Sequence, residues 1–112
     1  MNDGALIKTL IQFPEEPDWH PLVAVARLAE VTDALPSIDA HDFMYMAAVV
    51  SRRCALRIHL YKHRETRHYL NLDDGGHAYE YCGPVAANEA DDSGGRYRLH
   101  RSIAAALLAV LA

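Results

Sequence analysis

Apolar and polar residues alternate through the middle of the chain, which is the pattern of half-buried β-strands. Residues 56–62 read LRIHLYK, with an aliphatic side chain at every second position up to the fifth. Residues 67–73 and 77–82 follow with weaker alternation, and the DDGG between them is a strong signal for a hairpin turn. Residues 96–100 alternate again. The pattern predicts an antiparallel β-meander of three to four strands.

The lengths of the turns decide which side chains share a face. A two-residue turn after Asp73 would place Leu72 opposite His77, and an odd-numbered loop between the first two strands would pair Ile58 with Leu70. Directly opposed residues lie on the same face, and a slip of one residue inverts the arrangement. We therefore expect one face, formed by the leucines together with Tyr79 and Tyr81, that packs on the core, and a second face of Arg, His and Tyr side chains. The sequence leaves open whether another element covers that second face.

Helical periodicity flanks the meander. Residues 5–13 carry apolar positions at helical spacing and also alternate, and we favour a helix over a strand there. Residues 21–35 begin with Pro21 and carry a broad apolar stripe. Residues 40–53 have acids near their start and two arginines at their end, which suits the helix dipole. Residues 103–111 are apolar all round, which predicts a helix that is buried or forms the seam of a homodimer.

Two segments interrupt these elements. Residues 14–21 hold three prolines, and residues 83–95 are small, polar and acidic, so both are predicted to be loops and the second to be flexible. A chain of 112 residues fits one domain. We predict a single α+β domain over residues 1–112, with N-terminal helices, a three- to four-stranded antiparallel β-meander covered on one face, and a C-terminal helix.

Charge is divided unevenly along the chain. The net charge is −4, but residues 1–51 hold two bases against eight acids, and residues 52–112 hold nine bases against seven acids. Such an asymmetry is typical of a surface for an acidic partner, or of two halves that complement each other within the fold.

The longest apolar run, residues 103–112, falls short of the roughly 20 residues that span a bilayer. With two cysteines and no secretory signal, we expect a cytoplasmic protein that binds no membrane.

Seven histidines and two cysteines invite a test for metal and catalytic motifs. The sequence contains no CxxC, HExxH or GxSxG motif and no phosphate-binding glycine loop. We therefore predict no metal ligands, no cofactor and no catalytic residues. A small enzyme that uses His59 and Glu80 as an acid–base pair, with Cys82 nearby, is the third-ranked hypothesis.

The predicted second face of the sheet is the candidate binding site. Tyr and Arg are enriched at the residues that dominate protein interfaces. The predicted binding residues are Arg57, His59, Tyr61, Arg67, Tyr69 and Arg98. We expect a small interaction or regulatory module whose partner is a protein with an acidic patch or a second copy of this chain. The alternative is nucleic-acid binding, because a basic face with tyrosines suits single strands.

Overall fold

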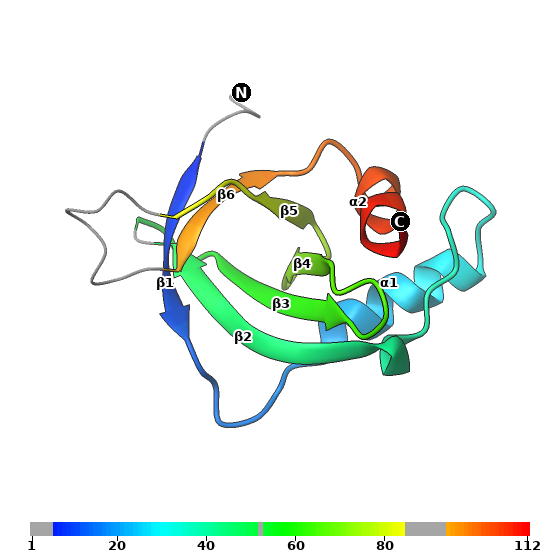
Figure 1. The fold of residues 1–112 in the computed structure, drawn as a ribbon, viewed down its shortest axis with the longest axis horizontal. Coiled ribbons are helices and arrows are strands. Elements are labelled where there is room, and N and C mark those ends of the chain that lie inside the picture. Colours follow the sequence, from blue (N-terminus) through cyan, green and yellow to red (C-terminus); the bar gives the residue numbers. More distant parts are fainter. Residues whose placement is uncertain (1–5, 52, 85–93) are drawn as a thin grey trace.

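The computed structural model describes residues 6–51, 53–84 and 94–112, and within them six antiparallel strands close into a barrel (Figure 1). Each strand pairs with the next along the chain, and β6 closes the barrel by pairing with β1. The strands are β1 (Ile7–Gln12), β2 (Phe43–Ser51), β3 (Arg57–His63), β4 (Tyr69–Asp73), β5 (Ala78–Tyr81) and β6 (Gly95–Leu99). The helical elements are α1 (His20–Glu30), the 3-10 turn η1 (Ala40–Asp42) and α2 (Ile103–Leu111).

The predicted open meander with N-terminal helices is wrong, because two of the segments expected to be helical are strands of the barrel. Residues 40–53 form η1 and β2, and residues 7–12 form β1. Strand β2 is hydrogen-bonded on both sides, to β1 and β3, and its long apolar run fits a helix as well as a buried strand. In β1, the alternation of residues 7–12 was the better guide to its structure.

A β-bulge at Met46 lets β2 contribute buried side chains to both sides of the barrel wall. Tyr45 pairs with Tyr61 and Ala47 pairs with Leu60, so Met46 is an extra residue with no counterpart on β3. A bulge of one residue reverses the alternation of the strand that carries it. Phe43 and Tyr45, before the bulge, therefore face the helices, whereas Ala47 and Val49, after it, face the barrel interior.

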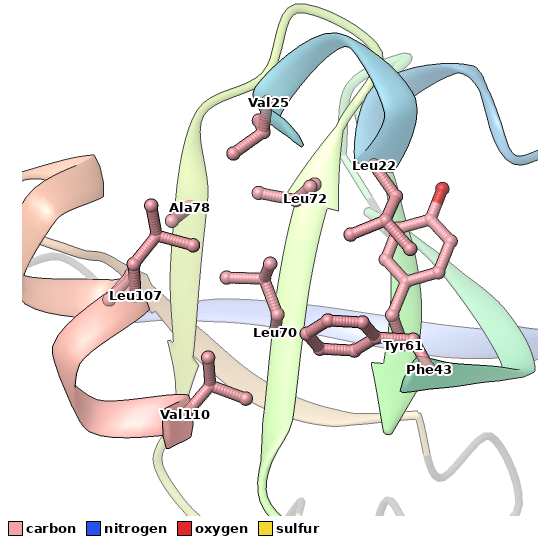
Figure 2. Close-up of a cluster of buried hydrophobic side chains, with 10 residues drawn as sticks. Leu22, Val25, Phe43, Tyr61, Leu70, Leu72, Ala78, Leu107 and Val110 are labelled. Atoms are coloured by element: carbon pink, nitrogen blue, oxygen red, sulfur yellow. The ribbon is translucent and has the colours of Figure 1, made fainter. Parts of the chain in front are cut away.

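Two hydrophobic clusters lie on the two sides of this wall. The first packs between the barrel and the helices α1 and α2, which lie on the same side of the barrel next to β4 (Figure 1). Its buried members, most of them labelled in Figure 2, are Leu22, Val25, Phe43, Tyr61, Leu70, Leu72, Ala78, Ala106, Leu107 and Val110. The second cluster belongs to the barrel interior, and its buried members are Ala47, Val49, Ile58, Leu60 and Tyr97.

The loop between β3 and β4 has an even number of residues, not the odd number predicted. It spans residues 64–67, and the register sets Tyr61 opposite Leu70 and Ile58 opposite Asp73. The predicted pairing of Ile58 with Leu70 is therefore wrong. Since one residue of slip moves every side chain of a strand to the other face, the odd-numbered residues of β3 face the helices.

The turn between β4 and β5 is also one residue longer than predicted. It contains residues 74–76, so Leu72 lies opposite Ala78 instead of His77. Gly76 has a φ of +83°, the left-handed conformation that ends a three-residue hairpin loop. The leucines of β4 consequently face the helices while the tyrosines of β5 face inward, which separates two groups that the sequence had placed together.

The helices differ from prediction in extent and burial. Helix α1 ends at Glu30, five residues before the predicted end at residue 35, whereas α2 covers the predicted residues and its Ala105 N–H donates to the Ser102 hydroxyl at 3.0 Å. One face of α2 packs on the sheet, but Leu108 is 63% exposed, so the helix is not buried all round.

Most of the predicted acidic loop, residues 85–93, lies outside the described residues. In the part of the chain described, neither helix is long and apolar enough to cross a membrane.

Candidate functional site

The structure buries two of the six predicted binding residues. His59 and Tyr61 are 1% and 0% exposed, on the face of β3 that is turned toward the helices. Their predicted exposure is wrong, because the register sets them opposite Leu72 and Leu70, in the layer that α1 covers. The open question about the second face of the sheet is thereby answered for β3, where His59 and Tyr61 lie beneath the helices.

The other four predicted residues are accessible but do not share one surface. Arg57 is exposed at the start of β3, and Arg67 is exposed in the β3–β4 loop, where it has a φ of +67°. Tyr69 is 43% exposed at the first position of β4. Arg98 lies on β6, where its Nε donates to Glu80 Oε1 at 2.8 Å. The predicted continuous Arg–His–Tyr face is therefore not formed.

The tyrosines instead gather at one end of the barrel. Lys62 lies opposite Tyr69, and Tyr81 lies opposite Tyr97. Extending the β4–β5 register by two residues sets Tyr69 beside Tyr81, so these four side chains form a row across the inner face of four neighbouring strands. They lie where β3 ends and β4 begins, and we call this row the barrel-mouth surface.

A cavity of about 290 Å³ opens at the barrel-mouth surface. Its lining residues are Leu60, Tyr69, Asn71, Tyr81 and Tyr97. The ring of Tyr97 is buried and meets the ring of Tyr81 edge to face, with centroids 5.5 Å apart. The Lys62 ammonium lies 5.6 Å from the centroid of the Tyr69 ring, which is the geometry of a cation–π contact. The cavity is thus aromatic, with a positive charge at its rim.

Two residues, one lining this cavity and one lining an adjacent cavity, have a buried polar atom without a hydrogen-bond partner among the described residues. Asn71 donates through Nδ2 to the Tyr79 carbonyl at 3.2 Å, but its buried Oδ1 has no hydrogen-bond partner among the described residues. The same holds for the buried Nδ1 of His100, which lines an adjacent cavity of about 330 Å³ together with Arg67. A buried polar atom without a hydrogen bond costs about 1–3 kcal/mol of folding free energy, so such atoms are uncommon in protein interiors.

Burial also fixes the protonation of Tyr97. Removal from water, followed by the neighbouring Tyr81 and Tyr69, raises the pKa of the Tyr97 phenol to about 12. The phenol is therefore neutral at physiological pH and contributes no negative charge to the cavity.

Of the residues around the cavity, sequence reasoning had singled out Tyr69 as a binding residue and had assigned Tyr81 to the core. Their common position depends on the register of the β4–β5 and β5–β6 pairs, which the sequence pattern did not predict correctly for the first pair.

A second polar cluster surrounds His59 on the opposite side of the barrel wall. The Tyr45 hydroxyl lies 2.9 Å from His59 Nδ1, and His59 Nε2 lies 2.8 Å from Asp74 Oδ1. Asp18 Oδ2 is 3.9 Å from the same Nε2. Trp19 covers the cluster, with its ring centroid 5.9 Å from that of Tyr45. Sequence reasoning missed this group because its members come from separate loops and strands.

The environment of this cluster shifts two pKa values. Burial of the Asp18 carboxyl by itself raises its pKa, but hydrogen bonds from the backbone and ring of His20 and the nearby His59 together lower it below 3.8. Burial, and then the negative charge of Asp18, raises the pKa of Tyr45. Asp18 is therefore held as a carboxylate and Tyr45 as a neutral phenol.

The proposed acid–base pair of the enzyme hypothesis is divided between two places. His59 is bound to Tyr45 and Asp74, whereas Glu80 is bound to Arg98 between β5 and β6. In comparisons with protein-family models, with curated proteins and with solved structures, no match was found.

Proposed function

We propose that this protein is an interaction module that binds another protein through the barrel-mouth surface. The observation that carries the proposal is the aromatic cavity, because two of its three tyrosines, Tyr69 and Tyr81, are 43% and 56% exposed. Tyrosine is one of the residue types enriched among those that dominate the binding energy of an interface. This surface replaces the continuous Arg–His–Tyr face expected from the sequence.

The size of the cavity favours one large side chain of a partner over a cofactor. Small-molecule sites commonly enclose roughly 300–1,000 Å³, and the cavity of about 290 Å³ lies just below that range. Its Leu60 and tyrosine walls suit an aromatic or branched aliphatic side chain. A partner that inserts such an anchor would bury the two exposed tyrosine rings.

The charge around the cavity favours an acidic partner segment. Lys62 lies over Tyr69 at the rim, and Arg67 lines the adjacent cavity together with His68. Glu80 also lines that adjacent cavity, but its carboxylate is bound to Arg98. We therefore infer a partner that presents an apolar anchor next to an Asp or Glu.

A nucleic acid is the less favoured occupant. Single-strand binding needs a continuous positive track beside the stacking rings. Here Arg98 is bound to Glu80, Arg57 lies at the far end of β3, and the whole chain carries a net charge of −4. The tyrosines are thus present without the basic path that would hold a phosphate backbone.

Selection from a displayed random-peptide library tests the proposal. Peptides enriched on the wild-type protein should combine an aromatic or aliphatic anchor with a neighbouring acid, and the double variant Tyr69→Ala/Tyr81→Ala should bind them roughly 30-fold more weakly or worse. Leu28→Ala is the matched control, because Leu28 is a large apolar residue that is 49% exposed on α1, which packs on the helix-facing side of the barrel wall. Far-ultraviolet circular dichroism checks that each variant is folded.

Three outcomes would contradict the proposal. Equal peptide binding by the wild type and the double variant would remove the barrel-mouth surface from consideration. A labelled single-stranded oligonucleotide that binds the wild type at low salt and is lost in the double variant, with no peptide enriched, would replace the protein partner by a nucleic acid. Concentration-dependent dimerisation that the double variant abolishes would make the occupant a second copy of the chain.

A further inference from the structure

We propose that Asp18, His59 and Asp74 form a binding site for a divalent transition-metal ion such as Zn²⁺. One ligand atom of each residue lies within 4.8 Å of those of the other two. An imidazole nitrogen and carboxylate oxygens bind Zn²⁺ at about 2.0–2.2 Å. Ligand atoms around such an ion therefore need to be within a few ångströms of one another, as these atoms are. The site lies on the helix-facing side of β3 and does not include the barrel-mouth surface.

His59 is held in the orientation that a metal ligand needs. Its ring is 1% exposed, and the Tyr45 hydroxyl lies 2.9 Å from Nδ1. With its proton on Nδ1, the ring donates to the Tyr45 oxygen and presents the Nε2 lone pair to the two carboxylates. Metal-binding histidines characteristically donate their second ring N–H to a neighbouring oxygen in this way. Tyr45 is thus a positioning residue for His59.

The two carboxylates come from loops whose backbones are fixed. Tyr61 donates from its hydroxyl to the Asp18 carbonyl at 2.5 Å, and the His20 N–H donates to Asp18 Oδ1 at 3.0 Å. Asp74 occupies the three-residue turn after β4, which is closed by the Gly76 N–H donating to the Asp73 carbonyl at 3.0 Å. The ligands are therefore brought together by the fold and need no large rearrangement to bind an ion.

Charge gives a reason for an ion at this point. A single N–H on His59 Nε2 can make a short bond to one carboxylate, and the distances are 2.8 Å to Asp74 and 3.9 Å to Asp18. A dication between the three groups would contact all of them and neutralise both negative charges. Because the Asp74 and Asp18 side chains are 68% and 37% exposed, an ion would reach the site from solvent and keep water on its open positions.

The donor set favours a transition metal over calcium or magnesium. Ca²⁺ takes six to eight oxygen ligands and Mg²⁺ prefers an octahedral shell of oxygens. One buried imidazole with two carboxylates instead suits Zn²⁺ and its first-row neighbours. Zn²⁺ is the appropriate probe, because it accepts three protein ligands and a water molecule.

Calorimetric titration of Zn²⁺ into the chelator-treated, full-length protein tests this proposal. We expect one ion per chain, and we expect Asp74→Asn and Asp18→Asn each to weaken binding at least tenfold. The matched control is Asp39→Asn, because Asp39 also accepts from a histidine two residues later, with 3.1 Å between Oδ1 and His41 Nδ1, but lies outside the cluster. A Cys54→Ser control removes the exposed thiol as a competing ligand.

A spectroscopic measurement separates this site from other histidines. Imidazole ¹⁵N spectra should show a large shift of His59 Nε2 with one equivalent of Zn²⁺, and Tyr45→Phe should weaken binding by a smaller factor than the Asp variants. Unchanged affinity in both Asp74→Asn and Asp18→Asn, or a Zn²⁺-induced shift at His41 or His20 with none at His59, would overturn the proposal. So would the absence of saturable Zn²⁺ binding to the wild type.

Discussion

Tyr81 lies so close to Gly95 that the glycine is required for its position: a Cβ on residue 95 would come within 2.5 Å of Tyr81 Cε1. Gly95 also has a φ of +90°, a conformation that other residues rarely adopt. One residue of β6 therefore sets the place of an exposed ring in the barrel-mouth surface. The close approach links the stability of the barrel to the shape of its cavity.

Gly95→Ala should accordingly lower both stability and peptide binding. The strained φ alone should cost about 1–3 kcal/mol of unfolding free energy, and the added methyl group should push the Tyr81 ring away from Tyr97. Urea unfolding and peptide affinity measure the two effects. Gly75→Ala is the control, because its Cβ would make a nearest contact of 3.2 Å with a side-chain atom of His77 and its φ is not positive. Wild-type stability in Gly95→Ala would contradict this account.

Leu72→Ala should destabilise the layer between barrel and helices. Leu72 is fully buried and lies between α1 and α2 among the side chains shown in Figure 2. Truncation of a buried leucine typically costs about 2–5 kcal/mol, because it removes apolar contact and leaves a cavity. Leu108→Ala, at a position 63% exposed on α2, should change stability by no more than about 0.5 kcal/mol. Similar urea midpoints for the two variants would show that the helices do not pack as described.

Phenol titration should distinguish the folded from the unfolded protein. Burial is the main cause that raises the pKa values of Tyr45, Tyr61, Tyr79 and Tyr97, the last to about 12. Groups with a raised pKa contribute stability that is fully present below their unfolded pKa of about 10 and is lost as pH rises above it. Near pH 10, the native protein should therefore show less phenolate absorbance than the urea-unfolded protein. Coincident titration curves would contradict the burial of these phenols.

Acid should act on stability through Asp18. Its pKa is lowered in the folded protein, so its contribution is fully present above the unfolded value near 3.8 and is lost as pH falls through the lower, folded value. The unfolding free energy of the wild type should fall in this acidic range. Asp18→Asn should show a shallower fall, whereas Asp33→Asn, at an exposed position, should follow the wild type. Identical slopes for Asp18→Asn and wild type would exclude this role.

Local patterns predicted the strands after residue 56 and the final helix. They failed for β2, where burial on both sides erased periodicity, and in β1 they fitted a helix as well as a strand. The alternation of β3 and the uniform apolar run of α2 are signals within a few residues, and both elements formed at or within one residue of the predicted bounds. Strand β2 reads FMYMAAVVS, in which Phe43 and Tyr45 face the helices and, after the bulge at Met46, Ala47 and Val49 face the barrel interior. No local sequence pattern predicts that bulge.

The candidate site was only partly accessible to sequence reasoning. Tyr69 was correctly expected to be accessible, but the even loop of residues 64–67 placed His59 and Tyr61 on the opposite side of the wall from Tyr69, beneath the helices. Hairpin length was the decisive quantity, because one residue more or less exchanges the two faces of a strand. The neighbours of Tyr69 on β5 and β6, Tyr81 and Tyr97, follow from the three-residue turn of residues 74–76 and from the pairing of β5 with β6.

The sequence by itself determined the hairpin-forming segments, the C-terminal helix and the supply of aromatic and charged side chains. These depend on neighbours within a few positions, where alternation, glycine turns and capping act. Only the tertiary structure decided the closure of β6 on β1 and the convergence of Asp18 and Asp74 on His59. Those outcomes depend on contacts between distant segments, whose energies arise from burial and hydrogen bonding after the chain has folded.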